Sequence, residues 1–185
     1  MINQFNKYPL LSHNTFGIEA IAEQFVEFSS VDDLLSYLGK GFDGRSLVIG
    51  GGSNLLFVND FEGTVFHSLI KGMEVVEEDD MSLLLRVGSG VNWDELVAYT
   101  VENGWGGLEN LSAIPGEVGA SAVQNVGAYG VEAGDLIVKV ETVRLSDATR
   151  AEFLHDDCNF SYRHSIFKAA EKGKHIITHV TYRLS

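Results

Sequence analysis

The residues best suited to ligand chemistry stand in a glycine-rich run after an apolar segment, in the order L-V-I-G-G-G-S-N-L-L-F. Glycine lacks a Cβ atom, so Gly50, Gly51 and Gly52 can adopt positive φ and bring backbone N–H groups together around an anion. Ser53 and Asn54 add side-chain donors, and the whole run suits a diphosphate. A tight β-turn that binds nothing explains three glycines equally well at this point.

Two widespread phosphate-binding motifs do not fit this run. The Rossmann pattern G-x-G-x-x-G opens a helix, whereas Leu55 occupies the third glycine position and we expect a strand over Leu55–Val58. The P-loop ends in Gly-Lys-Ser/Thr, and this run contains no lysine. If the run binds phosphate, it does so as a nest of backbone amides rather than through a helix terminus.

A second candidate is the small-residue segment I-P-G-E-V-G-A-S-A-V-Q-N-V-G-A-Y-G, residues 114–130. A flat heterocycle has room beside three of its residues, which carry little or no side chain: Gly116, Gly119 and Ala120. Gln124 and Asn125 carry amides that can read the edge of a flavin or a pyrimidine. Pro115 suits the first position of a short helix whose amides point at a ligand. The alternative is a small-residue helix that packs closely on a sheet.

A third candidate is the arginine in S-Y-R-H-S-I-F-K. Arg163 follows Tyr162 and precedes the apolar pair Ile166–Phe167, so we expect its guanidinium to be partly desolvated. Such a cation needs a carboxylate or phosphate partner. That partner is either one of the many acidic side chains of this chain or a bound anionic substrate.

The other reactive side chains form no obvious metal or redox site. The six histidines do not make a ligand set, and His175 and His179 are too far apart along one strand to share an ion. Cys158 is the single cysteine, so an internal disulfide is impossible and a packing role is expected. A cytoplasmic location agrees with this cysteine usage.

An α+β fold is expected to position these segments, because runs of strands alternate with few helices. The ranges that read as strands are Ile18–Phe28, Ser46–Gly50, Gly63–Leu69, Met73–Asp79, Ser82–Gly88, Leu136–Leu145 and His175–Ser185. The compact apolar run Ser46–Gly50 is expected to be a buried strand. Ser30 is expected to cap a short helix, with Asp33 at its third position. Asn92 is expected to cap a second helix that ends near Asn103–Gly104.

The length of 185 residues suits one large or two small domains. We expect two lobes, 1–105 and 106–185, with the boundary in Gly104–Gly107. The formal net charge is −13 and lysine and arginine do not cluster, which argues against a nucleic-acid partner. No signal peptide and no apolar run of roughly 18–20 residues is visible, so no membrane partner is expected.

Four segments taken in order resemble the UDP-N-acetylenolpyruvoylglucosamine reductase family, also called UDP-N-acetylmuramate dehydrogenases. They are Asn14–Gly17, Ile49–Leu56, Gly107–Gly130 and Tyr162–Lys168. The resemblance runs from about Asn14 to the last residue, and the combination is specific although no single motif is. It implies a two-lobed FAD-binding fold of the vanillyl-alcohol-oxidase type.

The resemblance also implies the site residues. Those that would bind FAD are Gly50, Gly51, Gly52, Ser53, Asn54, Leu55, Ile114, Pro115, Gly116, Gly119, Ala120, Gln124, Asn125, Gly127, Ala128, Tyr129 and Ile177. Tyr162 and Arg163 fall on the substrate side. Arg163 matches the catalytic arginine, which stabilises negative charge on the substrate carboxylate.

The reaction implied by the resemblance belongs to peptidoglycan precursor synthesis. Hydride passes from NADPH through the flavin to C3 of an enolpyruvyl group on a UDP-linked sugar, and protonation at C2 completes a D-lactyl ether. In the family, a third domain carries the serine and the glutamate that serve this protonation, and neither maps onto this chain. We therefore expect an N-terminal fragment that is inactive or nearly so alone. An FAD-dependent oxidase of the same fold and a non-catalytic binding module are the alternatives. The oligomeric state stays open.

Overall fold

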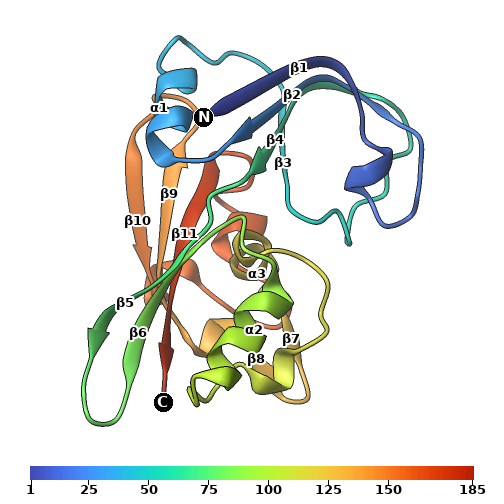
Figure 1. Cartoon of the computed structure of the whole chain (residues 1–185). Coiled ribbons are helices and arrows are strands. Elements are labelled where there is room, and N and C mark those ends of the chain that lie inside the picture. The colour runs from blue at the N-terminus through green and yellow to red at the C-terminus, as the bar shows by residue number, and fades with distance from the viewer.

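The computed structural model describes residues 1–185 and contains two main β-sheets (Figure 1). The first sheet has the strand order β1-β2-β4-β3. Its members are β1 (Ile2–Pro9), β2 (Ile21–Phe28), β3 (Ser46–Ile49) and β4 (Phe61–Ser68). β1 runs antiparallel to β2, whereas β2 and β3 both run parallel to β4. Parallel neighbours need a crossover connection, and helix α1 (Val31–Leu38) lies between β2 and β3 in the chain.

The second sheet is antiparallel throughout, in the order β10-β9-β11-β6-β5. Its strands are β5 (Met73–Glu78), β6 (Leu83–Gly88), β9 (Ile137–Arg144), β10 (Arg150–Leu154) and β11 (His175–Leu184). Helices α2 (Trp93–Glu102) and α3 (Val118–Gln124) share its largest core cluster, in which Trp93 and Tyr182 are fully buried. The short ribbon β7–β8 (Gly127–Ala128 and Val131–Glu132) follows α3. The 3₁₀ turns are η1 (Leu11–His13), η2 (Glu109–Leu111), η3 (Ala133–Asp135), η4 (His155–Cys158) and η5 (Ile166–Lys168).

Two smaller core clusters cover the two faces of the first sheet. On one face, Phe28 and Phe66 pack with Leu34 of α1 and with Val143 and Ile176 of the second sheet. On the other face, a second cluster gathers beneath the loops that follow β1 and β3, and its members are Leu10, Ala20, Ala22, Phe25, Ile49, Phe57 and Val65. Each fully buried large apolar side chain contributes about 1.5–3 kcal/mol. Because the cluster around α1 contains residues of both sheets, its apolar contacts join the two sheets.

The predicted helix caps are confirmed. The Ser30 hydroxyl accepts a hydrogen bond from the Asp33 amide at 3.1 Å. The Asn92 side chain accepts from the amides of Asp94 and Glu95 at 2.9 and 3.2 Å. Both caps satisfy N–H groups that have no partner inside the helix. The predicted α+β class is confirmed as well.

Three local predictions are wrong. Leu55–Val58 is not a strand, because β4 is the only neighbour of β3 and no strand lies beside this segment. β3 itself is an edge strand rather than a buried one, and Val48 is 38% exposed. Pro115 does not begin a helix, since α3 starts three residues later, after Glu117 as its N-cap.

The sheets do not divide the chain at 105/106, where the lobe boundary was expected. The chain passes from the first sheet to the second between β4 and β5, in residues 69–72, so β5, β6 and α2 belong with the second sheet. The glycines at 104–107 instead mark the end of α2, where Gly104 has a φ of +75°. None of the helices is long and apolar enough to span a membrane.

Candidate functional site

The glycine run forms a loop that leaves β3 and rests on the turn after β1. Gly52 has a φ of +67°, and a Cβ atom there would lie 1.9 Å from the carbonyl oxygen of His13. The Thr15 amide donates to the Gly52 carbonyl at 3.3 Å. Asn14, which is buried, shapes the turn by donating to Leu10 O and accepting from the Ile18 amide. The loop therefore has a fixed base that only glycine permits at position 52.

The upper part of the same loop carries backbone donors that nothing in the chain uses. The N–H groups from Gly51 to Leu56 donate no hydrogen bond to another group of the protein. Gly51 and Asn54 are exposed, and Ser53 is half-buried. Successive free amides on a partly open loop form the kind of nest that binds phosphate oxygens.

The structure brings this loop against the second predicted segment. The Ser53 hydroxyl donates to Pro115 O at 3.1 Å, and the side-chain amide of Asn54 donates to Gln124 Oε1 at 2.8 Å. A Cβ atom on Gly51 would lie 3.5 Å from the Cα of Gly116. A small cavity lies at this junction, and its lining is Ser53, Trp93, Ile114, Pro115, Gly116, Glu117, Ala120, Ser121, Gln124 and Val126.

Two other predicted residues, Asn125 and Gly119, make internal contacts. Asn125 is 1% exposed, and its amide donates to Glu132 Oε2 and Ser161 O while its oxygen accepts from the Gly134 amide. These internal bonds engage both the nitrogen and the oxygen of the side-chain amide, and its contact with a flavin stays a prediction. Gly119 donates to Ser89 O, and a Cβ atom there would come within 3.0 Å of Ser89.

The remaining predicted cofactor residues lie outside the cavity lining. Ile177 is 6% exposed and belongs to the core of the second sheet. A Cβ atom on Gly127 would lie 2.8 Å from Val131 O, so this glycine permits the close pairing of β7 and β8. Leu55 packs partly buried against the core beneath the first sheet. Beyond Ala128, Tyr129 is 90% exposed.

Arg163 lies near the second segment, but the prediction that its guanidinium is partly desolvated is wrong. The residue is exposed, with a φ of +53°. Its Nη2 donates to the carbonyl oxygen of Gly127, and its guanidinium carbon lies 5.8 Å from the centre of the Tyr162 ring. The internal partner is thus a carbonyl rather than a carboxylate, which leaves the other N–H groups of the guanidinium available.

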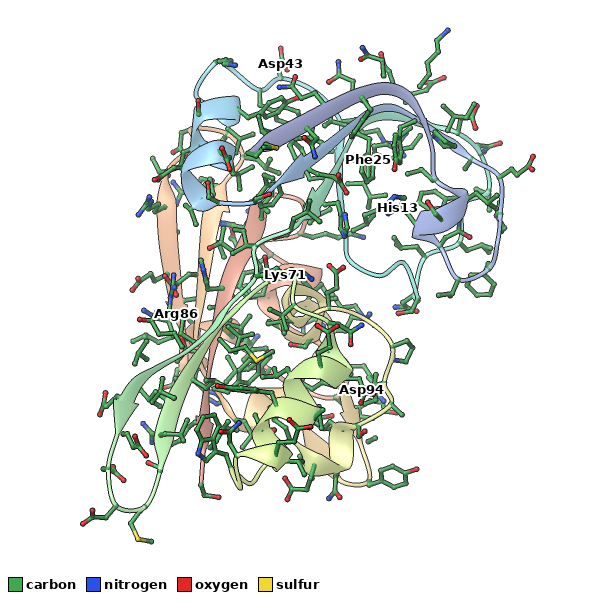
Figure 2. All side chains as sticks on the ribbon, viewed as in Figure 1. His13, Phe25, Asp43, Lys71, Arg86 and Asp94 are labelled. Carbon is green, nitrogen blue, oxygen red and sulfur yellow. The ribbon has the colours of Figure 1, made fainter.

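A buried ionic cluster beneath the glycine loop was not predicted. Nδ1 of His67 lies 3.1 Å from Glu27 Oε1, and Nε2 lies 3.1 Å from Glu117 Oε1. Burial by itself lowers the pKa of His67, but the bonds and charges of Glu117 and Glu27 raise it above its usual value. His13 lies close to Phe25 (Figure 2), and the centres of the two rings are 4.7 Å apart. The pKa of His13 is lowered by burial and by the charge of His67.

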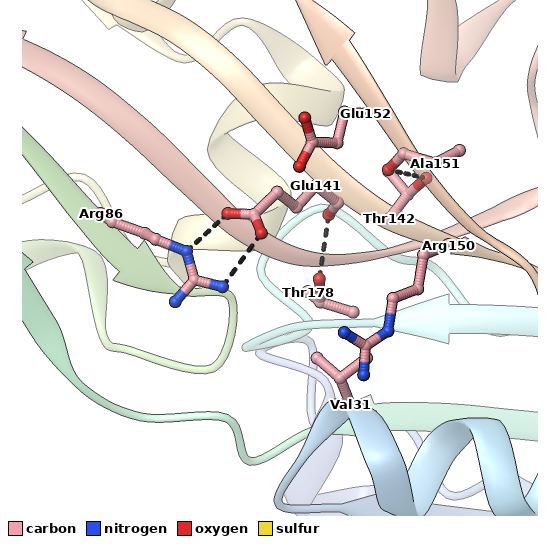
Figure 3. A pocket seen from close by; sticks show the side chains of 8 residues that line it. All are labelled: Val31, Arg86, Glu141, Thr142, Arg150, Ala151, Glu152 and Thr178. Carbon is pink, nitrogen blue, oxygen red and sulfur yellow. Dashed lines mark hydrogen bonds and ion pairs between the residues drawn. The ribbon is translucent and has the colours of Figure 1, made fainter. Parts of the chain in front are cut away.

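A larger hollow lies elsewhere, between α1 and strands of the second sheet (Figure 3). It encloses about 110 Å³, against about 30 Å³ for the cavity between the two loops. Its charged groups are already paired: Arg86 binds Glu141 through two bonds of 2.6 and 3.0 Å, and Arg150 binds Asp32 at 2.7 Å. The smaller cavity is therefore the better candidate, since it adjoins free donors. No group of three or more histidine, cysteine or acidic side chains is arranged to hold a metal ion.

Comparison with known proteins identifies the family of this chain. The sequence pattern of the family described as FAD binding domain matches residues 24–152, more than half of the chain. The chain belongs to the FAD-binding domain family. This match covers the glycine loop, α3 and the segment between them, which are the elements that line the cavity.

Relatives of this FAD-binding domain include longer proteins. The UDP-N-acetylenolpyruvoylglucosamine reductase of Bacteroides fragilis is 55% identical over 182 residues, which cover 97% of this chain and 54% of that protein. The protein of the same name from Porphyromonas gingivalis is 46% identical, with 96% and 53% covered. The chain therefore spans about half the length of these relatives.

Solved structures agree with the predicted two-lobed FAD-binding fold. UDP-N-acetylenolpyruvylglucosamine reductase from Thermus caldophilus superposes with a TM-score of 0.79 at 22% identity, covering all of this chain and 62% of that one. Cholesterol oxidase from Brevibacterium sterolicum gives 0.67 at 14% identity, over 38% of its chain. At these identities the likeness concerns the fold alone. The predicted fold of the vanillyl-alcohol-oxidase type is confirmed.

Proposed function

We propose that this chain is the FAD-binding part of an NADPH-dependent reductase that converts UDP-N-acetylglucosamine enolpyruvate to UDP-N-acetylmuramate for peptidoglycan synthesis. One observation carries the proposal: unused backbone donors from Gly51 to Leu56 face a small-residue segment in a chain that is 55% identical to such a reductase. The complete reaction is assigned to a protein of the length of those relatives. A cytoplasmic location fits the single buried Cys158 and the proposed soluble substrates.

The amides of the glycine loop would bind the diphosphate of FAD, since each points a donor that the chain itself does not use. Gly116 and Ala120 leave room for the flat ring system, and the Gln124 carboxamide lies at the same cavity. The bond between Asn54 and Gln124 holds the two sides in register. The bound cofactor would supply the hydride-transfer chemistry, and these residues would bind and orient it.

Arg163 is proposed to orient the substrate carboxylate and to stabilise the negative charge that develops on it. The bond to Gly127 O fixes one side of the guanidinium beside the loop that follows α3. The other N–H groups are exposed and can form a two-point contact with a carboxylate. Tyr162, which is 82% exposed, would line the same approach.

The first experiment tests the cofactor with the chain itself. The purified chain should carry FAD, or take it up stoichiometrically, and display the absorbance bands of a bound flavin. Titration of stripped protein with FAD, followed by quenching of flavin fluorescence, gives the dissociation constant. A colourless protein that takes up no FAD would contradict the proposal.

The second experiment tests the reaction in the corresponding full-length protein. Arg163→Ala should lower turnover roughly 10²–10³-fold, the loss typical for one donor to a developing oxyanion, while FAD affinity stays unchanged. Arg163→Lys keeps the charge without the two-point geometry and should recover part of the rate. Unchanged turnover in Arg163→Ala would refute the assigned role. Oxygen consumption without the sugar nucleotide would instead favour the oxidase alternative.

A further inference from the structure

His67 occupies a junction between the first sheet and α3. In the strand register, it lies opposite Glu27 of β2 and opposite Ile49 of β3, the last residue before the glycine loop. Glu117, the N-cap of α3, reaches it from the other side. His67 thus pairs through its backbone with the strand that leads into the glycine loop, and through its side chain with the N-cap of α3.

The geometry favours a proton on both ring nitrogens. Nδ1 and Nε2 of His67 each lie 3.1 Å from a carboxylate oxygen. A neutral imidazole has one N–H group and one lone pair, so its lone pair would face a carboxylate, whereas an imidazolium donates to both. The three side chains are only 12%, 18% and 16% exposed, which keeps the interaction from being screened by water.

The groups around His67 favour a positive charge on its ring and not on the neighbouring ring of His13. Glu27 faces it from β2 and Glu117 from α3. From η1, the ring of His13 packs edge-on at 5.4 Å, and its Nε2 is paired with the hydroxyl of Tyr8 in β1 at 3.2 Å. The pKa of His13 is lowered by burial and by His67, whereas that of His67 is raised by the two carboxylates against its burial.

The cluster reaches the glycine loop through Glu117. The second oxygen of this carboxylate, Oε2, lies 3.3 Å from the position that a Cβ atom would take on Gly50. The loop makes no hydrogen bond or ion pair with a lysine or arginine. His67 is therefore the nearby cation that offsets two carboxylates beside a site for an anion.

We propose that His67, as an imidazolium shared by Glu27 and Glu117, is a positioning residue that fixes and neutralises the Glu117 carboxylate beside the glycine loop and so sets the affinity for FAD. This inference rests on the proposed function, because it takes the diphosphate of FAD as the anion. Loss of the proton removes one of the two bonds and frees a carboxylate next to the loop. The freed carboxylate repels the diphosphate, so FAD affinity and protonation of His67 are coupled.

The sign of the pH dependence follows from the raised pKa. The imidazolium is fully formed below the ordinary histidine value of about 6.5, and it is lost as the pH rises through the higher value of the folded chain. FAD affinity should be constant near pH 6 and should fall about tenfold as the pH rises through the pKa of His67. A tenfold fall corresponds to a difference of about one unit between the pKa of His67 in the FAD-bound chain and in the free chain.

The experiment is an FAD titration of this chain from pH 6 to pH 9, read by flavin fluorescence. His67→Gln should bind FAD more weakly at pH 6 and should lose the pH dependence. His155→Gln is the matched control, because His155 is exposed and bonds only to Ile137 O, and it should keep the wild-type profile. Tight binding that does not vary with pH, or a His67→Gln profile identical to wild type, would overturn the inference and leave the proposed function standing. No FAD uptake at any pH would overturn the proposed function itself.

A second measurement does not depend on the folding of His67→Gln. The ring-proton NMR signal of His67 should titrate above the usual histidine pKa in the wild-type chain and at a lower pH in Glu117→Gln. Glu117→Gln should also reduce the pH dependence of FAD binding, because no carboxylate is released. An ordinary pKa for His67 in the folded wild type would refute the shared imidazolium.

Discussion

The two glycine-rich segments of this protein use the same residue type for opposite purposes. In the loop after β3, the amides from Gly51 onward are unused, and a Cβ atom on Gly51 would meet only ordinary contact distances. In the segment around α3, a Cβ atom would lie 3.0 Å from Ser89 if added to Gly119, and 2.8 Å from Val131 O if added to Gly127. The first segment keeps backbone open to a ligand, whereas the second brings backbone close to backbone. Substitutions should therefore separate binding from folding.

The largest expected effect comes from an exception inside the first segment. Gly52→Ala places a methyl group 1.9 Å from His13 O at a φ of +67°, so overpacking and backbone strain should together cost about 3 kcal/mol or more. Urea denaturation measures the loss in the free energy of unfolding. Gly51→Ala is the matched control and should unfold like the wild type. Equal stability of the two variants would show that the turn beneath Gly52 moves freely.

Asn125→Ala tests whether the second segment is structural. The substitution removes three hydrogen bonds, one buried and two partly buried, and leaves the Gly134 amide and Ser161 carbonyl without their partner. This loss should cost about 2–3 kcal/mol of unfolding free energy. Gln124→Ala, one residue earlier and half-buried, should cost far less. If Asn125→Ala instead kept full stability and lost only FAD affinity, the side chain would be a ligand contact after all.

Gly51→Val tests the open segment directly. Branched bulk at this position fills the space beside Gly116 and shields the neighbouring amides, so FAD affinity should fall at least tenfold, or about 1.4 kcal/mol. The unfolding free energy should change by less than about 0.5 kcal/mol, as is usual for an exposed site. Fluorescence titration and urea denaturation of one preparation give both values. Unchanged affinity would mean that the phosphates bind elsewhere.

The smallest expected effect concerns the bond that joins the two segments. Asn54→Ala removes the exposed 2.8 Å bond to Gln124 and should cost about 0.5 kcal/mol of stability. A double-mutant cycle with Gln124→Ala isolates the pairwise energy. A coupling energy near zero would indicate that the remaining contacts between the segments suffice to hold them together.

Local signals in the sequence predict the helix caps, but they do not show which segments become neighbours in a sheet. The caps at Ser30 and Asn92 are fixed by bonds that span three residues or fewer, so they could be predicted. Leu55–Val58 has the composition of a strand, yet a strand needs a neighbour, and the register of β3 and β4 leaves none. Composition alone therefore overestimates strand content in such loops.

The site shows the same limit at longer range. The glycine loop and the segment after Ile114 were recognised because each is a continuous motif. The cluster of His67 was missed, because Glu27 becomes its neighbour only through the parallel pairing of β2 with β4, and Glu117 through the docking of α3. Arg163 was expected to pair with a carboxylate or a phosphate, whereas its partner within the chain is the carbonyl oxygen of Gly127 in β7.

The passage of the chain from one sheet to the other at residues 69–72 has a consequence for biosynthesis. All strands of the first sheet, and the glycine loop with them, leave the ribosome before the second sheet begins. The residues that oppose the loop, 114–124, include Pro115 and Gln124, which emerge 62 and 70 positions after their partners in the loop. Val143 and Ile176, which pack against α1, emerge later still. N-terminal units fold first during synthesis, so the nascent chain at first exposes only the glycine-loop side of the proposed pocket. The cofactor can bind at this pocket only after residues 114–124 have been synthesised.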